Sequence, residues 1–346
     1  MKPVPFGQTG ISIPPIVYGT SFLGNLYRKI NDDVKFNIMQ NWFAAGSSPV
    51  CIDTAGKYGA GLALEVIGKG LSALGIDPEH IIMSNKLGWY RVPLTTDDPT
   101  FEPGIWADLQ YDAIQKISYQ GILDCYEQGC QLLGGKYKPQ LVSVHDPDEY
   151  LAEATDPADR EQRKQDIRDA YQALFELRDR GQIAAIGIGA KDWLVIRELY
   201  TEIPFDWVML ANSLTLFRHP AELLEFVHHI HKNGVGIINS AIFNAGFLTG
   251  GNYFDYRKID PSLVCDQDKL KWRTTLYEVC EHFKVNPGDA CMHFAWSPPE
   301  VQAIALNPSK PERIRQNVDI LQSPPPVSFW TALKEKNIIH KDYPYV

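Results

Sequence analysis

The chain has 346 residues, of which 45% are hydrophobic and 22% are charged, and its formal net charge at pH 7 is -9. This composition is typical of a globular protein with a substantial core, and the length fits one α/β barrel or two smaller domains. The acidic balance argues against a general nucleic-acid binder and against a binder of anionic membranes, because both need basic surface. We therefore expect a small-molecule partner.

The N-terminal segment has no apolar core of signal-peptide length, and no later apolar run is long enough to span a bilayer. We therefore expect the protein in the cytoplasm. The short runs 4–6 and 11–13 flank Gln8-Thr9-Gly10 and predict a hairpin. In a barrel, such a hairpin would cap the bottom.

From residue 15 onward, short β-branched runs alternate with amphipathic segments. The predicted strands are 16–18, 50–52, 81–85, 141–144, 183–188, 207–210, 236–239 and 301–306. The predicted helices are 32–45, 62–74, 118–133, 165–180, 194–200, 221–232, 269–283 and 312–321. Eight strand-then-helix units favour a closed (β/α)8 TIM barrel over an open sheet, built as a single domain over residues 1–346.

Three predicted connections, 88–116, 146–164 and 241–267, are longer than ordinary loops. Each follows a strand, so all three are expected on the C-terminal face of the barrel, where catalytic loops gather. The tail 323–346 begins with prolines and then carries several aromatic residues. It would either fold over the same face or form a helix packed elsewhere on the surface.

Four polar side chains stand at or just beyond consecutive strand ends: Asp53, Tyr58, Lys86 and His145. Asp53 would hold the ammonium of Lys86, which would lower the pKa of Tyr58, so that this phenol could exchange a proton with a substrate oxygen. His145 would orient that oxygen or relay its proton. Each residue alone has a structural explanation, such as a helix cap, an ion pair or core packing. Together they indicate proton transfer at an alcohol, coupled to hydride transfer by a nicotinamide cofactor.

At these four residues the chain resembles the aldo-keto reductase family. The family pattern is an Asp-Thr-Ala segment with a Tyr five residues after the Asp, then a strand-ending Lys and a strand-ending His. The resemblance covers nearly the whole chain. The segments 17–20, 58–65, 85–88 and 144–148 are most similar to the sugar dehydrogenase branch, which includes the L-fucose and D-threo-aldose 1-dehydrogenases. Plant L-galactose dehydrogenases and pyridoxal 4-dehydrogenases are similar relatives.

This branch implies an NAD(P)-dependent enzyme that oxidises the anomeric C1 hydroxyl of an aldose, such as L-fucose, L-galactose or D-arabinose, to the lactone. Trp89 and Tyr90 directly follow the strand that ends in Lys86, and the resemblance implies that they pack against the sugar ring. Core packing by these aromatic residues is the alternative. Asp146 would bind the sugar hydroxyls.

The segment 305–317 leaves the last predicted strand and opens a helix, a setting that suits an anionic cofactor. NADP-preferring relatives usually carry Lys-Ser where this chain has Asn307-Pro308, so NAD is expected, and Lys310 leaves NADP open. Small residues replace the relatives' nicotinamide contacts near Ser240, and Asn212 is the substitute candidate. The resemblance implies these cofactor-binding residues: Gly19, Thr20, Asn212, Ser240, Ala241, Gly246, Leu248, Asn307, Ser309, Lys310, Arg313 and Asn317.

Two other motifs are discounted. Residues 68–73 fit a GxGxxA pattern but lie inside a predicted helix rather than between a strand and a helix. The histidines at 228, 229 and 231 have no partner pair at metal-site spacing, so no metal is expected.

Two other functions stay open, an NADPH-dependent reductase of aldehydes or ketones and a non-catalytic nucleotide-binding regulator.

Overall fold

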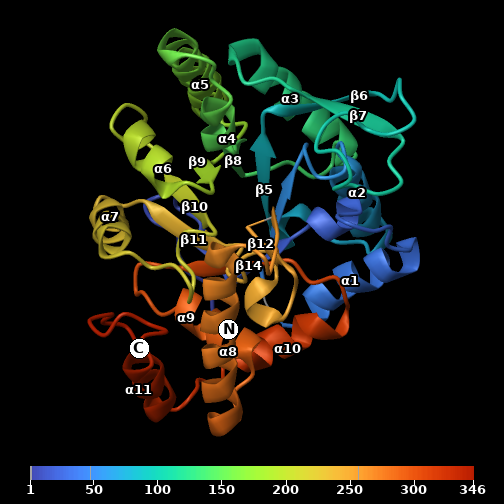
Figure 1. Cartoon of the computed structure of the whole chain (residues 1–346). Coiled ribbons are helices and arrows are strands. Elements are labelled where there is room, and N and C mark those ends of the chain that lie inside the picture. The colour runs from blue at the N-terminus through green and yellow to red at the C-terminus, as the bar shows by residue number, and fades with distance from the viewer. Residues whose placement is uncertain (1, 47, 256) are drawn as a thin grey trace.

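Eight parallel strands form a closed barrel, which confirms the predicted (β/α)8 fold (Figure 1). The computed structural model describes residues 2–46, 48–255 and 257–346. Around the barrel the strands run β3 (Ile16–Gly19), β4 (Val50–Ala55), β5 (Ile81–Leu87), β8 (Leu141–His145), β9 (Ala185–Ala190), β10 (Trp207–Ala211), β11 (Gly236–Ser240) and β14 (Ala303–Leu306). The ring closes where β14 pairs with β3, with Ile304 opposite Ile16.

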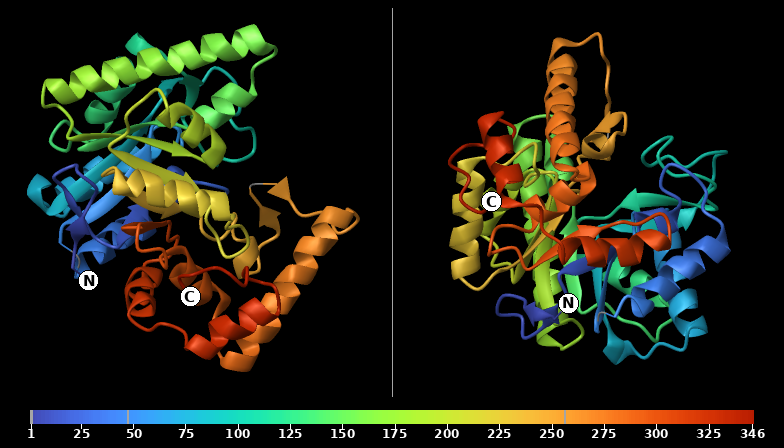
Figure 2. Two further views of the ribbon diagram at one scale, coloured as in Figure 1. Left: turned by 90° about the vertical axis from the view of Figure 1, so that its left-hand side faces the viewer. Right: turned by 90° about the horizontal axis from the view of Figure 1, so that it is seen from below.

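Helices surround this barrel on its outer side (Figures 1 and 2). They are α1 (Asp32–Ala44), α2 (Leu62–Ala73), α3 (Tyr119–Leu132), α5 (Pro157–Asp179), α6 (Trp193–Tyr200), α7 (Ala221–Lys232), α8 (Val264–Phe283), α9 (Pro287–Ala295) and α10 (Glu312–Leu321). Helix α5 begins earlier than predicted, because the Asp156 side chain accepts hydrogen bonds from two backbone amides and Pro157 occupies the first turn. No helix in the described part of the chain is apolar over enough of its length to cross a bilayer.

The N-terminal hairpin closes the bottom of the barrel, as predicted. Strands β1 (Val4–Pro5) and β2 (Ser12–Ile13) pair antiparallel. Phe6 is fully buried and its ring centroid lies 6.2 Å from that of Trp207 at the start of β10. Phe6 belongs to a buried cluster with residues of all eight barrel strands, so it fills the end of the barrel opposite to the strand tips.

The three long connections form structure of their own at the C-terminal ends of the strands. The connection after β5 contains the antiparallel hairpin of β6 (Trp89–Pro93) and β7 (Tyr111–Gln115). The connection after β8 contains the short helix α4 (Pro147–Ala152), and the one after β11 contains the paired strands β12 (Tyr253–Phe254) and β13 (Arg257–Lys258). These segments surround the mouth of the barrel.

The C-terminal tail forms helix α11 (Val327–Glu335), which lies beside α8 (Figure 1). Its buried residues Phe329, Trp330 and Leu333 share a second hydrophobic core with Leu276 of α8 and Phe294 of α9. Among the described residues, the tail contributes nothing to the lining of the large cavity at the barrel mouth. Of the two alternatives from the sequence, the helix packed elsewhere on the surface is therefore the one found.

Candidate active site

The four predicted catalytic residues meet at the C-terminal mouth of the barrel. Asp53 lies on β4, Lys86 on β5 and His145 at the end of β8, while Tyr58 lies in the loop after β4. Lys86 Nζ forms a short ion pair with Asp53 Oδ2, and both side chains are about 5% exposed or less. The hydroxyl of Ser84 donates a 3.0 Å hydrogen bond to Asp53 Oδ1. This buried pair is held rigidly, because both carboxylate oxygens have partners.

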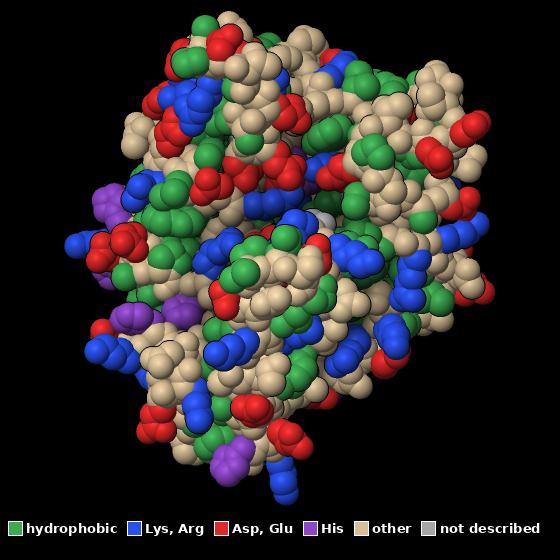
Figure 3. All heavy atoms as spheres, in the orientation of Figure 1, with side chains coloured by type: hydrophobic (Ala, Val, Ile, Leu, Met, Phe, Trp, Pro, Cys, Tyr) green, Lys and Arg blue, Asp and Glu red, His purple; other side chains and the backbone are tan. Residues whose placement is uncertain are grey.

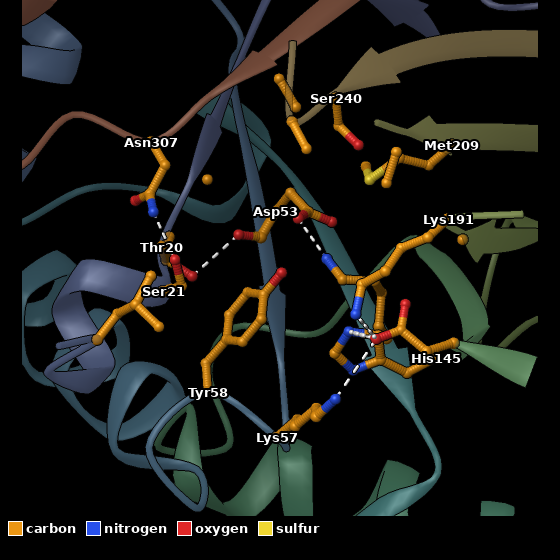
Figure 4. Close-up of a pocket in the computed structure, with 18 of the residues that line it drawn as sticks. Thr20, Ser21, Asp53, Lys57, Tyr58, His145, Lys191, Met209, Ser240 and Asn307 are labelled. Atoms are coloured by element: carbon orange, nitrogen blue, oxygen red, sulfur yellow. Dashed lines mark hydrogen bonds and ion pairs between the residues drawn. The ribbon is translucent and has the colours of Figure 1, made fainter. Parts of the chain in front are cut away.

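The ring of Tyr58 lies close to both the Lys86 ammonium and the imidazole of His145. The ammonium of Lys86 lies 4.9 Å from the Tyr58 ring centroid, in a cation–π arrangement. The rings of Tyr58 and His145 are nearly perpendicular, with centroids 5.6 Å apart. Figure 4 shows the Tyr58 hydroxyl pointing into the cavity, on the side of Asp53. A substrate oxygen at this point would therefore meet a phenol and an imidazole together.

The expected lowering of the Tyr58 pKa by Lys86 is wrong for this structure. The pKa of Tyr58 lies well above its usual value of about 10, chiefly because the ring is buried, and the negative charges of Asp53 and Asp146 raise this pKa further. Lys86 is paired with Asp53, and its ammonium contacts the face of the ring. At neutral pH, Tyr58 is therefore a neutral phenol that can donate a proton.

His145 is neutral at physiological pH. Its pKa lies well below 6.5, first because the ring is buried and then because Lys57, Lys86 and Lys191 place positive charge around it. Its Nε2 lies 3.6 Å from Oδ2 of Asp146. A neutral imidazole can orient a substrate oxygen by hydrogen bonding without adding a charge to the site.

These residues line a cavity of about 470 Å³. Acidic and basic side chains gather around the hollow in the face shown in Figure 3. The volume suits a small-molecule ligand. Besides the four catalytic candidates, the lining residues are Gly19, Thr20, Ser21, Leu26, Lys57, Glu102, Pro103, Ile105, Trp106, Asp146, Glu149, Gly189, Ala190, Lys191, Met209, Ala211, Ser240, Ala241, Asp255, Ala305, Leu306 and Asn307.

Five of the predicted cofactor residues line this cavity: Gly19, Thr20, Ser240, Ala241 and Asn307. Thr20 donates a 2.9 Å hydrogen bond to the backbone carbonyl of Asp53, so it ties β3 to β4. The amide of Asn307 donates a short hydrogen bond to the Ser21 hydroxyl. Asn307 therefore holds the loop after β3 in place, and its neutral amide offers no positive charge to a phosphate.

The other predicted cofactor residues lie outside the cavity lining. Asn212 directly follows β10, is buried, and has a carbonyl oxygen without a hydrogen-bond partner among the described residues. This unpaired acceptor beside Ser240 suits the amide donor of a nicotinamide. Gly246 directly precedes a 3-10 helix, Phe247–Thr249, in the loop after β11, and Leu248 is buried in the second core. Ser309 and Lys310 precede α10, and Arg313 and Asn317 lie within it.

The start of α10 suits an anionic group. Lys310, just before α10, and Arg313, in its first turn, are basic and exposed there, whereas the backbone N–H groups of Arg313 and Ile314 already donate to the carbonyls of Lys310 and Pro311. Together with the unpaired Asn212 oxygen at the barrel mouth, these residues fit a cofactor with phosphates at one end and an amide at the other. Among the described residues, no cluster of His, Cys, Asp and Glu has the arrangement of a metal site.

The structure separates the three predicted substrate residues. Asp146 lines the cavity. Trp89 and Tyr90 lie on β6 and are absent from the lining that the described residues form. The Trp89 ring packs against Phe101 at 5.8 Å, and Lys116 lies 4.2 Å from the Tyr90 ring centroid. For these two aromatics, the structure therefore favours the alternative of packing.

Several residues that line the cavity were not predicted from the sequence, among them Lys57, Trp106 and Lys191. Trp106 lines the cavity, and its ring centroid lies 6.0 Å from that of Tyr58. Lys57 was visible beside Tyr58 in the strand-end motif, and Lys191 directly follows β9, so their positions were a usable signal. Trp106 lies in an irregular stretch without periodicity, which gives no such signal.

Comparisons with known proteins agree with this geometry. A model of the Aldo/keto reductase family matches residues 15–338. A pyridoxal 4-dehydrogenase from Microbacterium luteolum is 26% identical, with 96% of each chain covered. A D-threo-aldose 1-dehydrogenase from Pseudomonas sp is also 26% identical, over 95% of this chain and 96% of that protein. The fold is similar to that of an aldo-keto reductase from Bacillus halodurans solved in its holo form, with a TM-score of 0.68, 19% identity and coverage of 97% and 96%.

Proposed function

Because this chain belongs to the aldo/keto reductase family, we propose that it is an NAD(P)-dependent dehydrogenase that oxidises the anomeric hydroxyl of an aldose to the lactone. The main observation that supports this proposal is that one cavity, with a wall of charged side chains, contains Asp53, Tyr58, Lys86 and His145. Such a wall suits a ligand with many hydroxyls, each of which both donates and accepts hydrogen bonds. The similarity to a D-threo-aldose 1-dehydrogenase over nearly the full chain supports this substrate class.

The chain's residues would divide the chemistry as follows. A nicotinamide cofactor held by Asn212 and the residues around the start of α10 would supply the acceptor for the hydride of the substrate carbon. Tyr58 takes the proton of the reacting hydroxyl, so that hydride and proton leave the substrate by separate routes. His145 holds the reacting oxygen by a hydrogen bond. Asp53 keeps the ammonium of Lys86 against the Tyr58 ring, where its charge faces the phenolate that accepts the proton.

Sugar oxidation is expected to rise with pH. Because the pKa of Tyr58 lies well above 10, nearly all of the enzyme carries the protonated phenol at neutral pH, whereas oxidation needs a phenolate that accepts the proton. We expect kcat/KM for oxidation to increase at least about tenfold from about pH 7 to about pH 9, while aldehyde reduction stays nearly flat. An oxidation rate that is flat or falls across this range would contradict the role of Tyr58 as the proton acceptor.

Two tryptophans provide a matched test of the cavity wall. Trp106 lines the cavity, and its Nε1 donates a 2.7 Å hydrogen bond to Glu102, whereas Trp89 packs outside the cavity. We expect Trp106→Ala to raise KM for the sugar about tenfold, because a ring that contacts ligand contributes roughly 1 to 2 kcal/mol. Trp89→Ala is expected to lower the thermal unfolding temperature and to change KM less. Steady-state kinetics and thermal melts of both variants give the comparison, and the reverse pattern would exclude Trp106 from substrate binding.

The direct test is a screen of cofactors and sugars. Addition of L-fucose, L-galactose or D-arabinose should reduce NAD or NADP, which is followed by the near-ultraviolet absorbance of the reduced nicotinamide. Parallel assays with the two cofactors decide which one the enzyme prefers, and our sequence-based expectation is NAD. Absence of turnover across a broad sugar panel would refute the substrate assignment.

Pyridoxal belongs in the same screen, because a pyridoxal 4-dehydrogenase is similar over 96% of the chain. The aromatic wall formed by Tyr58 and Trp106 would suit its flat ring. Turnover of aldehydes with NADPH but not of sugars with either cofactor would instead favour a carbonyl reductase. Nucleotide binding without turnover in either direction would favour a non-catalytic regulator.

A further inference from the structure

Lys57 is a buried cation that joins two of the long connections at the barrel mouth. Its side chain is about 5% exposed. Its Nζ lies 2.7 Å from Glu102 in the connection after β5. The same atom lies 3.1 Å from Glu149 and 3.4 Å from Asp146 in the connection after β8. Three carboxylates therefore share one ammonium.

Lys191, directly after β9, approaches two of these carboxylates, Asp146 and Glu149. Its Nζ lies 3.5 Å from Asp146 Oδ2 and forms a short ion pair with Glu149. Figure 4 shows Lys57 and Lys191 reaching toward the region of His145 from different sides. We call the five residues Lys57, Glu102, Asp146, Glu149 and Lys191 the ion cluster. All five line the cavity, and Asp146 links them to His145 at 3.6 Å.

The ion cluster favours the ionised form of the Asp146 carboxylate. Burial disfavours this carboxylate, but the neighbouring lysines outweigh burial, so the pKa of Asp146 is lowered. Its backbone has a φ of 47°, in the left-handed region that Asp tolerates better than most residues. Strained backbone of this kind concentrates at functional sites. The carboxylate is therefore fixed beside His145.

The cavity wall carries more negative than positive groups. Its charged lining consists of three lysines, Lys57, Lys86 and Lys191, and five carboxylates, Asp53, Glu102, Asp146, Glu149 and Asp255. Asp255 also pairs at 3.1 Å with Arg218, which lies outside the lining, so one carboxylate remains in excess. Behind the wall, burial and the adjacent Asp146 raise the pKa of Asp148 to about 6, so this carboxylate is also ionised at neutral pH. An anionic substrate would have to displace carboxylates that already bind the lysines. A neutral polyol would instead find donors and acceptors side by side.

We propose that the ion cluster is the substrate-selecting part of the cavity and that it selects uncharged polyhydroxylated substrates over those that carry phosphate or carboxylate. This inference rests on the proposed function for its substrate class. Asp146 and Glu149 accept hydrogen bonds from substrate hydroxyls beside the reacting carbon, while Lys57 and Lys191 donate to the hydroxyl oxygens. The excess of carboxylates repels an added anion.

The test compares neutral and anionic partners of matched shape. In oxidation, D-arabinose is compared with D-arabinose 5-phosphate. In reduction, methyl 4-formylbenzoate is compared with 4-carboxybenzaldehyde. We expect the ratio of kcat/KM, neutral over anionic, to exceed about tenfold for the wild type. We expect Asp146→Asn to reduce this ratio at least about tenfold, because one unit charge a few ångströms away has more than a tenfold effect at an effective dielectric constant near 20. Glu149→Gln should reduce the ratio less, because its side chain is 42% exposed.

The control is Glu153→Gln. Glu153 directly follows α4, its side chain is 63% exposed, and it pairs with Arg163 rather than with the ion cluster. The ratio of kcat/KM, neutral over anionic, should be the same for Glu153→Gln as for the wild type. Equal or preferred turnover of the anionic partners by the wild type would overturn the inference, as would unchanged ratios in both cluster variants. If the thermal melt shows that Asp146→Asn does not fold, the ratio of kcat/KM measured for Glu149→Gln tests the inference instead. If no sugar is oxidised, the proposed function fails, and the aldehyde pair still decides the charge selection.

Discussion

Replacement of Tyr58 by Phe should abolish turnover while cofactor binding survives. The variant keeps the ring that packs 5.6 Å from His145 and beneath the Lys86 ammonium, and it removes only the hydroxyl. A positioned acid or base typically contributes a factor of about 10² to 10⁴, so we expect kcat to fall by at least about 10² in both directions. The measurement is steady-state oxidation of the active sugar and reduction of an aldehyde.

The control for this variant is the cofactor affinity. Because the variant removes only the hydroxyl and leaves every predicted cofactor-binding residue in place, the dissociation constant for the reduced cofactor should stay within about threefold of the wild type. A thermal melt should also show an unchanged fold, since a buried ring of the same size remains. Retained turnover with an intact fold would disprove proton transfer by Tyr58.

The barrel was predictable because each unit carries a local signal. Strands such as β4 are buried along their whole length, so they read as short apolar runs, and amphipathic helices follow them. The predicted limits of α7 and α10 match the structure at both ends. Helix α9 was missed. It has only nine residues and is buried along much of its length, which weakens the one-sided pattern that identifies a surface helix.

The catalytic residues were predictable because parallel strands bring their tips together. Asp53, Lys86 and His145 each need only a strand end to reach the barrel mouth. The pKa of Tyr58 was not predictable, because it depends on the burial of the ring and on the balance of charges around it. Likewise, the partners of Lys57 come from connections dozens of residues away, where no sequence pattern links them.

Replacement of Lys86 by Met should damage both stability and turnover. The change leaves the Asp53 carboxylate, about 4% exposed, with Ser84 as its remaining side-chain partner among the described residues. Removal of one member of a buried ion pair typically costs about 3 to 5 kcal/mol, because the other charge stays buried without compensation. We expect the free energy of unfolding, measured by urea denaturation, to fall by about this amount, and kcat to fall by about 10² or more.

A second substitution separates the two effects. In the double variant Asp53→Asn with Lys86→Met, no uncompensated charge remains, so we expect at least half of the lost stability to return. Turnover should not return, because the positive charge that faces the Tyr58 ring at 4.9 Å is still missing. Recovery of turnover together with stability would mean that the buried pair acts only through folding. A single Lys86→Met variant as stable as the wild type would show that the pair contributes no net stability. Both results can be read from the same urea titrations and rate assays.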